Sequence, residues 1–232
     1  MSIFRIVCGP SDLDGGGYRW YNSDITGANT ALWDNTRVAG AFEIDPAGGI
    51  TLPTGAPSGN DTWYHFRYAH DSDSLFNDDI FARIQDSNSE TLAYLLYTDS
   101  RVSMAVVGAD GSANRSFTGT QALAINTTYS MGLHVTVDAT ISCRWYINGA
   151  LYGEVSVPNS LSKGKAVNLT FENDDGNQTF YVSEIAVADE DTRGMRIREM
   201  RPTSYGIFQE WDGSINSLRD TDRATGISTD VA

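Results

Sequence analysis

Paired carboxylates are the first arrangement in this sequence that could do chemistry. Glycosidases place two acids on one face of a cleft, as in the spacing E-x-D-x-x-E. Glu43 and Asp45 begin such a run, but Gly48 stands where the third acid belongs and Pro46 interrupts the strand. We interpret this stretch as a loop with solvated acids, although acids distant in the sequence could still meet in space. We therefore expect no enzymatic activity.

The three histidines do not form a recognisable catalytic or zinc-binding motif. The sequence has no His-x-x-His or Cys-x-x-Cys spacing and no G-x-S-x-G elbow. His134 alternates with Leu133 and Val135, so we expect it on the outer face of a strand.

Acidic loops give the one indication of an ion. Four aspartates supply hard oxygen ligands of the kind that Ca²⁺ prefers: Asp71, Asp73, Asp174 and Asp175. They do not fit the twelve-residue calcium loop with its closing glutamate. We favour solvated acidic loops, keep Ca²⁺ as an alternative, and expect no other cofactor.

Arginines alternate with apolar residues near the C-terminus. The basic positions are Arg193, Arg196, Arg198 and Arg201, and the large apolar side chains that follow are Tyr205, Phe208 and Trp211. One interpretation is that the arginines neutralise the acidic body within the same chain. The other is that they bind an acidic surface of another copy or another protein, with the aromatic residues as anchors.

Four aromatic residues are candidates for stacking against a sugar ring: Trp20, Trp33, Trp63 and Tyr152. Residues of these types are more often found in the core.

The elements that would position these residues are β-strands. In residues 141–157, Ile141, Cys143 and Trp145 alternate with polar residues up to Asn148-Gly149, the preferred dipeptide of a two-residue hairpin turn. Similar strand-like runs recur between short polar breaks at 63–69, 80–85, 91–98, 102–107, 129–137, 166–171 and 179–188. No sustained helical period occurs.

These patterns predict an all-β, antiparallel jelly-roll sandwich over residues 1–192 and an extended C-terminal arm over 193–232. We expect the first 60 residues, rich in glycine, to supply edge strands and long loops. Two immunoglobulin-sized domains are the alternative, but neither a repeat nor a linker near the midpoint supports them.

Charge and hydropathy exclude several classes of partner. The net charge is −14, which disfavours nucleic acid. Residues 193–232 hold six arginines and six acids, so the whole excess lies in residues 1–192. We find no stretch of about 20 apolar residues and no signal peptide, and therefore expect no membrane insertion.

Two segments resemble known families. Residues 63–187, centred on the WYINGALYGEVSV hairpin, resemble concanavalin A-like sandwiches, in particular laminin-G-like domains. The run 182–197, followed by Trp211-Asp-Gly213, is similar to a segment of tailed-bacteriophage virion proteins. The second resemblance implies a non-enzymatic structural protein of the virion, on the tail, baseplate, fibre or capsid surface, made in the host cytoplasm.

The functional hypothesis is thus a phage structural component that assembles through its arm, as a trimer or ring and with other virion proteins. A capsid decoration protein and a carbohydrate-binding module for a host-surface glycan are the alternatives.

Overall fold

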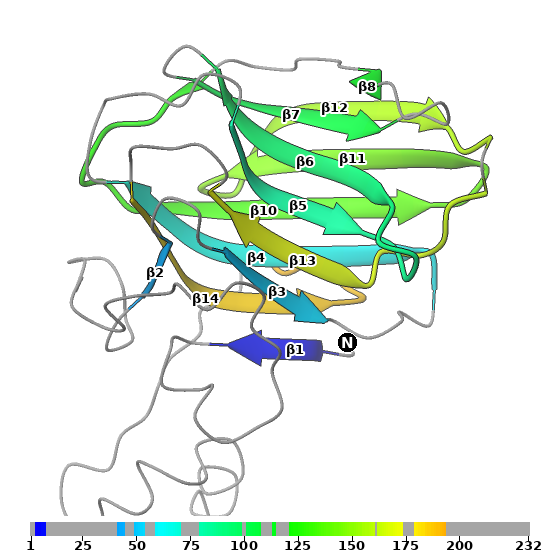
Figure 1. Ribbon diagram of the computed structural model, residues 1–232, viewed down its shortest axis with the longest axis horizontal. Helices are drawn as coiled ribbons and strands as arrows, with labels where there is room; N and C mark the ends of the chain where they lie inside the picture. The colour runs from blue at the N-terminus through cyan, green and yellow to red at the C-terminus, as the bar shows by residue number, and fades with distance from the viewer. Residues whose placement is uncertain are drawn as a thin grey trace, which may run out of the picture.

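The computed structural model describes residues 3–7, 41–44, 49–53, 59–70, 79–98, 101–107, 113–114, 121–160, 162–173 and 179–193. These residues form two seven-stranded antiparallel sheets that lie one on the other (Figure 1). No helix occurs in the described ranges, and so none that could span a membrane. The predicted all-β sandwich is confirmed.

The first sheet has the order β1-β14-β4-β10-β11-β12, and β2 also pairs with β14. Its strands are β1 (Ile3–Val7), β2 (Phe42–Ile44), β4 (Asp61–His70), β10 (Tyr129–Val137), β11 (Thr140–Ile147), β12 (Ala150–Pro158) and β14 (Phe180–Ala188). Strands β10, β11 and β12 follow one another in sequence and in space, as hairpin connections predict.

The second sheet has the order β3-β13-β5-β6-β7-β8, and β9 also pairs with β7. Its strands are β3 (Gly49–Pro53), β5 (Asp79–Gln85), β6 (Thr91–Thr98), β7 (Arg101–Val107), β8 (Ala113–Asn114), β9 (Gln121–Ala122) and β13 (Asn168–Glu172). Strands from the first 60 residues lie at the ends of both sheets, β1 in one and β3 in the other, as expected of edge strands. Glu43, which we interpreted as a loop residue, lies instead in β2, because its short segment pairs with β14.

The β11–β12 hairpin turns at the predicted dipeptide. Both Asn148 (φ 51°) and Gly149 (φ 82°) have the positive φ that this tight turn requires. The Asn148 side chain accepts a hydrogen bond from the Ser130 amide at 2.9 Å, and the Asn148 amide donates to the Ser130 carbonyl at 2.7 Å. The turn is therefore fastened to β10 as well as closing its own hairpin.

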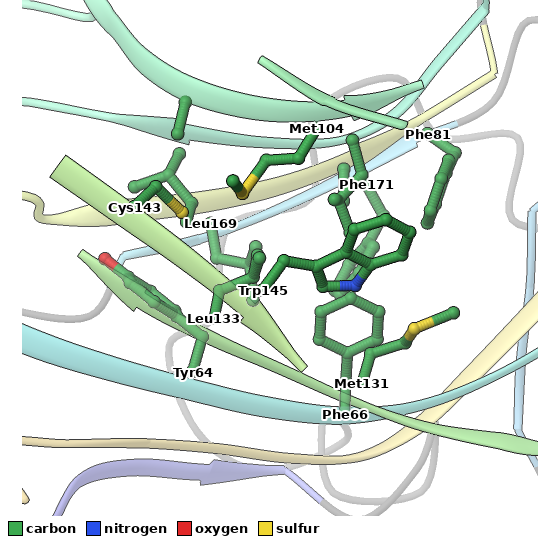
Figure 2. Close-up of a cluster of buried hydrophobic side chains, with 14 of the residues drawn as sticks. Tyr64, Phe66, Phe81, Met104, Met131, Leu133, Cys143, Trp145, Leu169 and Phe171 are labelled. Carbon is green, nitrogen blue, oxygen red and sulfur yellow. The ribbon is translucent and has the colours of Figure 1, made fainter. Parts of the chain in front are cut away.

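The core lies between the sheets and is built from the inner face of each strand. Figure 2 shows Phe66, Met131 and Trp145 from the first sheet and Met104, Leu169 and Phe171 from the second directed into one buried cluster. Phe66 meets Phe171 edge to face, with ring centroids 4.9 Å apart. Cys143 lies fully buried in the same core, and burial raises the pKa of its thiol.

Candidate functional site

The outer face of the first sheet carries polar and aromatic side chains in rows that run across the strands. The pairing register places Trp63 of β4 opposite His134 of β10, which in turn lies opposite Arg144 of β11 and, beyond it, Glu154 of β12. Neighbouring strands are about 4.8 Å apart, so a four-strand row spans roughly 14 Å. This length suits an extended ligand lying across the strands.

Aromatic rings form the centre of this face. The Trp63 indole stacks on the His134 imidazole, with centroids 4.1 Å apart and planes inclined by 5°. The Tyr146 ring lies 5.9 Å from Trp63 at an angle of 25°. Because all three rings stand on a hydrogen-bonded sheet, their relative positions are fixed before any ligand arrives.

Arg193 covers two of these rings. Its guanidinium carbon lies 4.4 Å from the centroid of Tyr146 and 5.5 Å from that of Trp63, within the range of cation–π interactions. The aliphatic part of Arg193 passes over Gly132, where an added Cβ would lie 3.6 Å from the Arg193 Cγ and 3.5 Å from the Tyr146 Cβ. The glycine thus leaves the space in which these two side chains meet.

Asp191 fixes the orientation of the Arg193 guanidinium. The Nε of Arg193 donates to both carboxylate oxygens of Asp191 at 2.9 Å, and its Nη2 donates to Oδ2. These hydrogen bonds, ahead of the opposing effect of burial, lower the pKa of Asp191 and raise that of Arg193. Both groups are therefore charged near neutral pH.

A second carboxylate anchors the histidine. Asp61 accepts hydrogen bonds from the Thr136 hydroxyl at 2.6 Å and from the His134 Nε2 at 2.9 Å. The bond from Thr136 is the largest cause that lowers the pKa of Asp61, followed on the same side by the bond from His134. Further along the row, the Arg144 Nε donates to Glu154 at 2.9 Å, and both side chains are 46% exposed. This face therefore holds a largely covered ring cluster, in which Tyr146 is 6% and the His134 side chain 13% exposed, bordered by charged groups that solvent reaches.

The structure describes three of the candidate residues that the sequence singled out. Trp63 lies in the aromatic centre, and Arg193 contacts Asp191, Tyr146 and Trp63 of its own chain. Tyr152 packs on the core residue Trp145, with centroids 5.2 Å apart. The other candidates lie outside the described residues: Trp20, Trp33, Asp71, Asp73, Asp174, Asp175, Arg196, Arg198, Arg201, Tyr205, Phe208 and Trp211.

The sequence did not identify most of the site. Its predicted outer-face position for His134 is confirmed, but the partners Asp61, Tyr146 and Asp191 were not singled out. Strand alternation indicates an outer-face position for Tyr146, because its neighbour Trp145 points inward. It does not indicate which strand lies beside Tyr146. Within the described ranges, no group of three or more His, Cys, Asp or Glu side chains is placed to bind a metal ion.

Comparison with known proteins supports the fold. No family model and no curated protein matches this chain. The receptor-binding domain of botulinum neurotoxin C/D mosaic serotype is similar over 82% of this chain and 48% of its own, with a TM-score of 0.59 and 10% identity. This chain thus spans about half the length of the toxin domain.

Two further solved structures are informative. An endo-β-1,4-glucuronan lyase from the fungus Trichoderma reesei is similar over 82% of this chain and 96% of its own, with a TM-score of 0.58 and 11% identity. The ligand-binding domain of botulinum neurotoxin serotype D in complex with N-acetylneuraminic acid is similar over 77% of this chain and 48% of its own (TM-score 0.50, 11% identity). At these identities the similarity shows a shared β-sandwich fold.

Proposed function

We propose that this chain is a carbohydrate-binding module and that the outer face of the first sheet, around Trp63, is its glycan-binding surface. The observation that carries the proposal is the aromatic centre of Trp63, His134 and Tyr146, bordered by charged side chains on four adjacent strands. Sugar-binding surfaces need both components, because the C–H faces of a pyranose pack on aromatic rings and its hydroxyls need hydrogen-bond partners.

The solved structures with the same fold support this choice over a purely structural role. One is a receptor-binding domain, one is in complex with a sugar, and one is a glucuronan lyase. Fold similarity by itself transfers no site, so the proposal depends on the residues of the outer face.

We propose further that the module binds its glycan without cleaving it. Hydrolysis of a glycosidic bond needs a protonated carboxyl as general acid, whose pKa is raised. Hydrogen bonds lower the pKa of both Asp61 and Asp191 instead. Incubation with oligosaccharides that bind, followed by chromatography and by ultraviolet detection of unsaturated ends, tests this; hydrolysed or eliminated products would contradict it.

The binding proposal is tested with a glycan array and with Trp63→Ala. Loss of the indole removes the ring contact, so we expect affinity for the glycans that bind to fall about tenfold or more. Ile125→Ala is a matched control, because Ile125 is an exposed apolar residue outside this face (38% exposed) and its loss should leave binding unchanged. An array without any bound glycan, or an unchanged affinity in Trp63→Ala, would reject this surface.

The resemblance of residues 182–197 and 211–213 to tailed-phage virion proteins supports a second proposal, about context. In it, the module is displayed on a virion, binds a host-surface glycan, and assembles through residues 193–232 with copies of itself or other virion proteins. Replacement of Arg196, Arg198 and Arg201 by Gln should lower the oligomer mass measured by light scattering. An unchanged mass would remove these arginines from assembly.

A further inference from the structure

The orientation of the Arg193 guanidinium is fixed from two directions. Asp191 holds its side edge through Nε and Nη2, and the rings of Tyr146 and Trp63 lie against its plane. A side chain held in this way gives up little conformational entropy when it binds a ligand. Arg193 is therefore preorganised to a degree that is unusual for an arginine whose side chain is 37% exposed.

The other edge of this guanidinium meets no hydrogen-bond acceptor in the described part of the chain. No described residue accepts a hydrogen bond from Nη1 of Arg193, and Asp191 accepts only in the direction of Nε and Nη2. The free edge presents one N–H from Nη1 and one from Nη2, side by side and in one plane. Two parallel donors of this kind match the two oxygens of a carboxylate.

The charges of this face oppose an anionic group less strongly than the net charge of the whole chain suggests. The whole chain has a net charge of −14, which repels anions. Around the aromatic centre, by contrast, three carboxylates have a cationic or hydrogen-bonding partner: Asp191 with Arg193, Glu154 with Arg144, and Asp61 with His134.

A second arginine extends the donor surface. Arg144 stands two residues before Tyr146 on β11, about 7 Å away along the same face. Only its Nε has a hydrogen-bond acceptor among the described residues, namely Glu154, so its Nη atoms also remain available.

We propose that the glycan bound at this face carries a carboxylate, as uronic and sialic acids do, and that Arg193 binds this carboxylate through its Nη1 and Nη2 edge. This inference rests on the proposed function. Arg144 binds the adjoining hydroxyls, and Trp63 supports the ring. Hydrogen bonds between a carboxylate and a fixed guanidinium are stronger than those to a neutral hydroxyl, so a neutral sugar would leave part of this edge unused.

The opposite role for Arg193 makes a different prediction. If the guanidinium only shields Trp63 and Tyr146 from solvent, a ligand must displace it, and removal of the arginine would increase affinity for every sugar. If it is the carboxylate receptor, its removal lowers affinity for acidic sugars alone. The two roles therefore change the affinity in opposite directions.

The experiment uses the full chain and two pairs of oligosaccharides that differ in the acidic group. One pair is a β-1,4-glucuronan oligosaccharide and its carboxyl-reduced form; the other is sialyllactose and lactose. Calorimetric titration of Arg193→Gln, Arg193→Lys and wild type measures each affinity. Arg101→Gln is the matched control, since it removes the same charge from an exposed position of β7 in the other sheet, and thermal unfolding verifies that all variants fold.

We expect wild type to bind the acidic member of at least one pair about tenfold more tightly or better, and the identity of that pair separates uronic from sialic acid. Arg193→Gln should abolish this preference, Arg193→Lys should restore part of it, and Arg101→Gln should retain it. Equal binding of acidic and neutral members, or tighter binding by Arg193→Gln, would overturn the carboxylate assignment while leaving the glycan-binding function in place. Absence of binding to any member, together with an empty array, would reject the function itself.

Discussion

The two outer faces of the sandwich have the same strand alternation and opposite surface character. On the first sheet, Trp63, His134 and Arg144 keep polar edges and charges within reach of solvent. On the second sheet, the outward residues Tyr94, Leu96, Ala105 and Val107 form a small apolar cluster that is itself buried. The difference shows that strand alternation alone does not determine which face is available for binding.

Ion pairs on the two outer faces differ in how far solvent reaches them. One arginine–glutamate ion pair from each outer face can be compared: Arg144 with Glu154 on the first, which also has the more buried pair Arg67–Glu184, and Arg83 with Glu172 on the second. The first pair is about half exposed, whereas the side chains of the second are only 26% and 16% exposed. The second face also carries a direct hydrogen bond between the Thr51 and Thr170 hydroxyls, 2.8 Å long. These polar groups of the second face therefore contact one another, whereas Arg144 of the first keeps Nη atoms without an acceptor among the described residues.

The largest difference between the faces should be in the unfolding free energy that is lost when a leucine on each face is replaced by alanine. Leu96 is 2% exposed on the second face and Leu151 is 55% exposed on the first. Leu96→Ala should lower the free energy of unfolding by about 2–3 kcal/mol through lost burial and a cavity, and Leu151→Ala by about 0.5 kcal/mol or less. Urea denaturation measures both. Similar losses in the two variants would mean that the faces are equally packed.

The coupling energies of the two ion pairs should differ by less than the unfolding free energies of the two leucine variants. A double-mutant cycle on Arg83 and Glu172 should give a coupling energy near 1 kcal/mol, because the pair is partly shielded from solvent. The same cycle on Arg144 and Glu154 should give about 0.3 kcal/mol, since water and salt screen exposed charges. If added salt weakened the two coupling energies equally, the predicted difference in shielding between the pairs would be wrong.

The smallest effect concerns the dependence of stability on pH. Asp61 has a folded-state pKa below the ordinary value of 3.8, so its hydrogen bonds stabilise the native state above that pH. This contribution is lost as pH falls through the folded-state pKa. Wild type should therefore exceed Asp61→Asn in urea midpoint at pH 7, and the difference should shrink below about pH 4. Asp138→Asn serves as the control, since Asp138 is exposed outside the aromatic centre; a difference that grows on acidification would contradict the role of Asp61.

Local sequence patterns predicted the strands because their causes are local. Alternation over 91–98 and 129–137 predicted strands with the observed bounds. Asn148-Gly149 predicted the observed turn, because few other residue pairs readily adopt positive φ at both positions. The short strands β2 and β3 were not located, because three to five residues carry too little periodicity to be distinguished from loop.

The arrangement of side chains on the outer face of the first sheet could not be predicted, since it depends on register between strands that are distant in the sequence. Trp63 and His134 stack because β4 pairs with β10 in one register, and a shift of one residue would place them on opposite faces. The position of Arg193 over Tyr146 likewise requires the chain after β14 to cross β10 near Gly132, which no local pattern indicates.

The absence of a side chain at Gly132 determines whether Arg193 can lie over the Tyr146 and Trp63 rings. A methyl group there would rest in ordinary contact with Tyr146 and Arg193, but any larger or branched substituent would push the arginine away from its rings. A single substitution at this position would then uncover the Tyr146 and Trp63 rings and change the groups that this face presents to solvent.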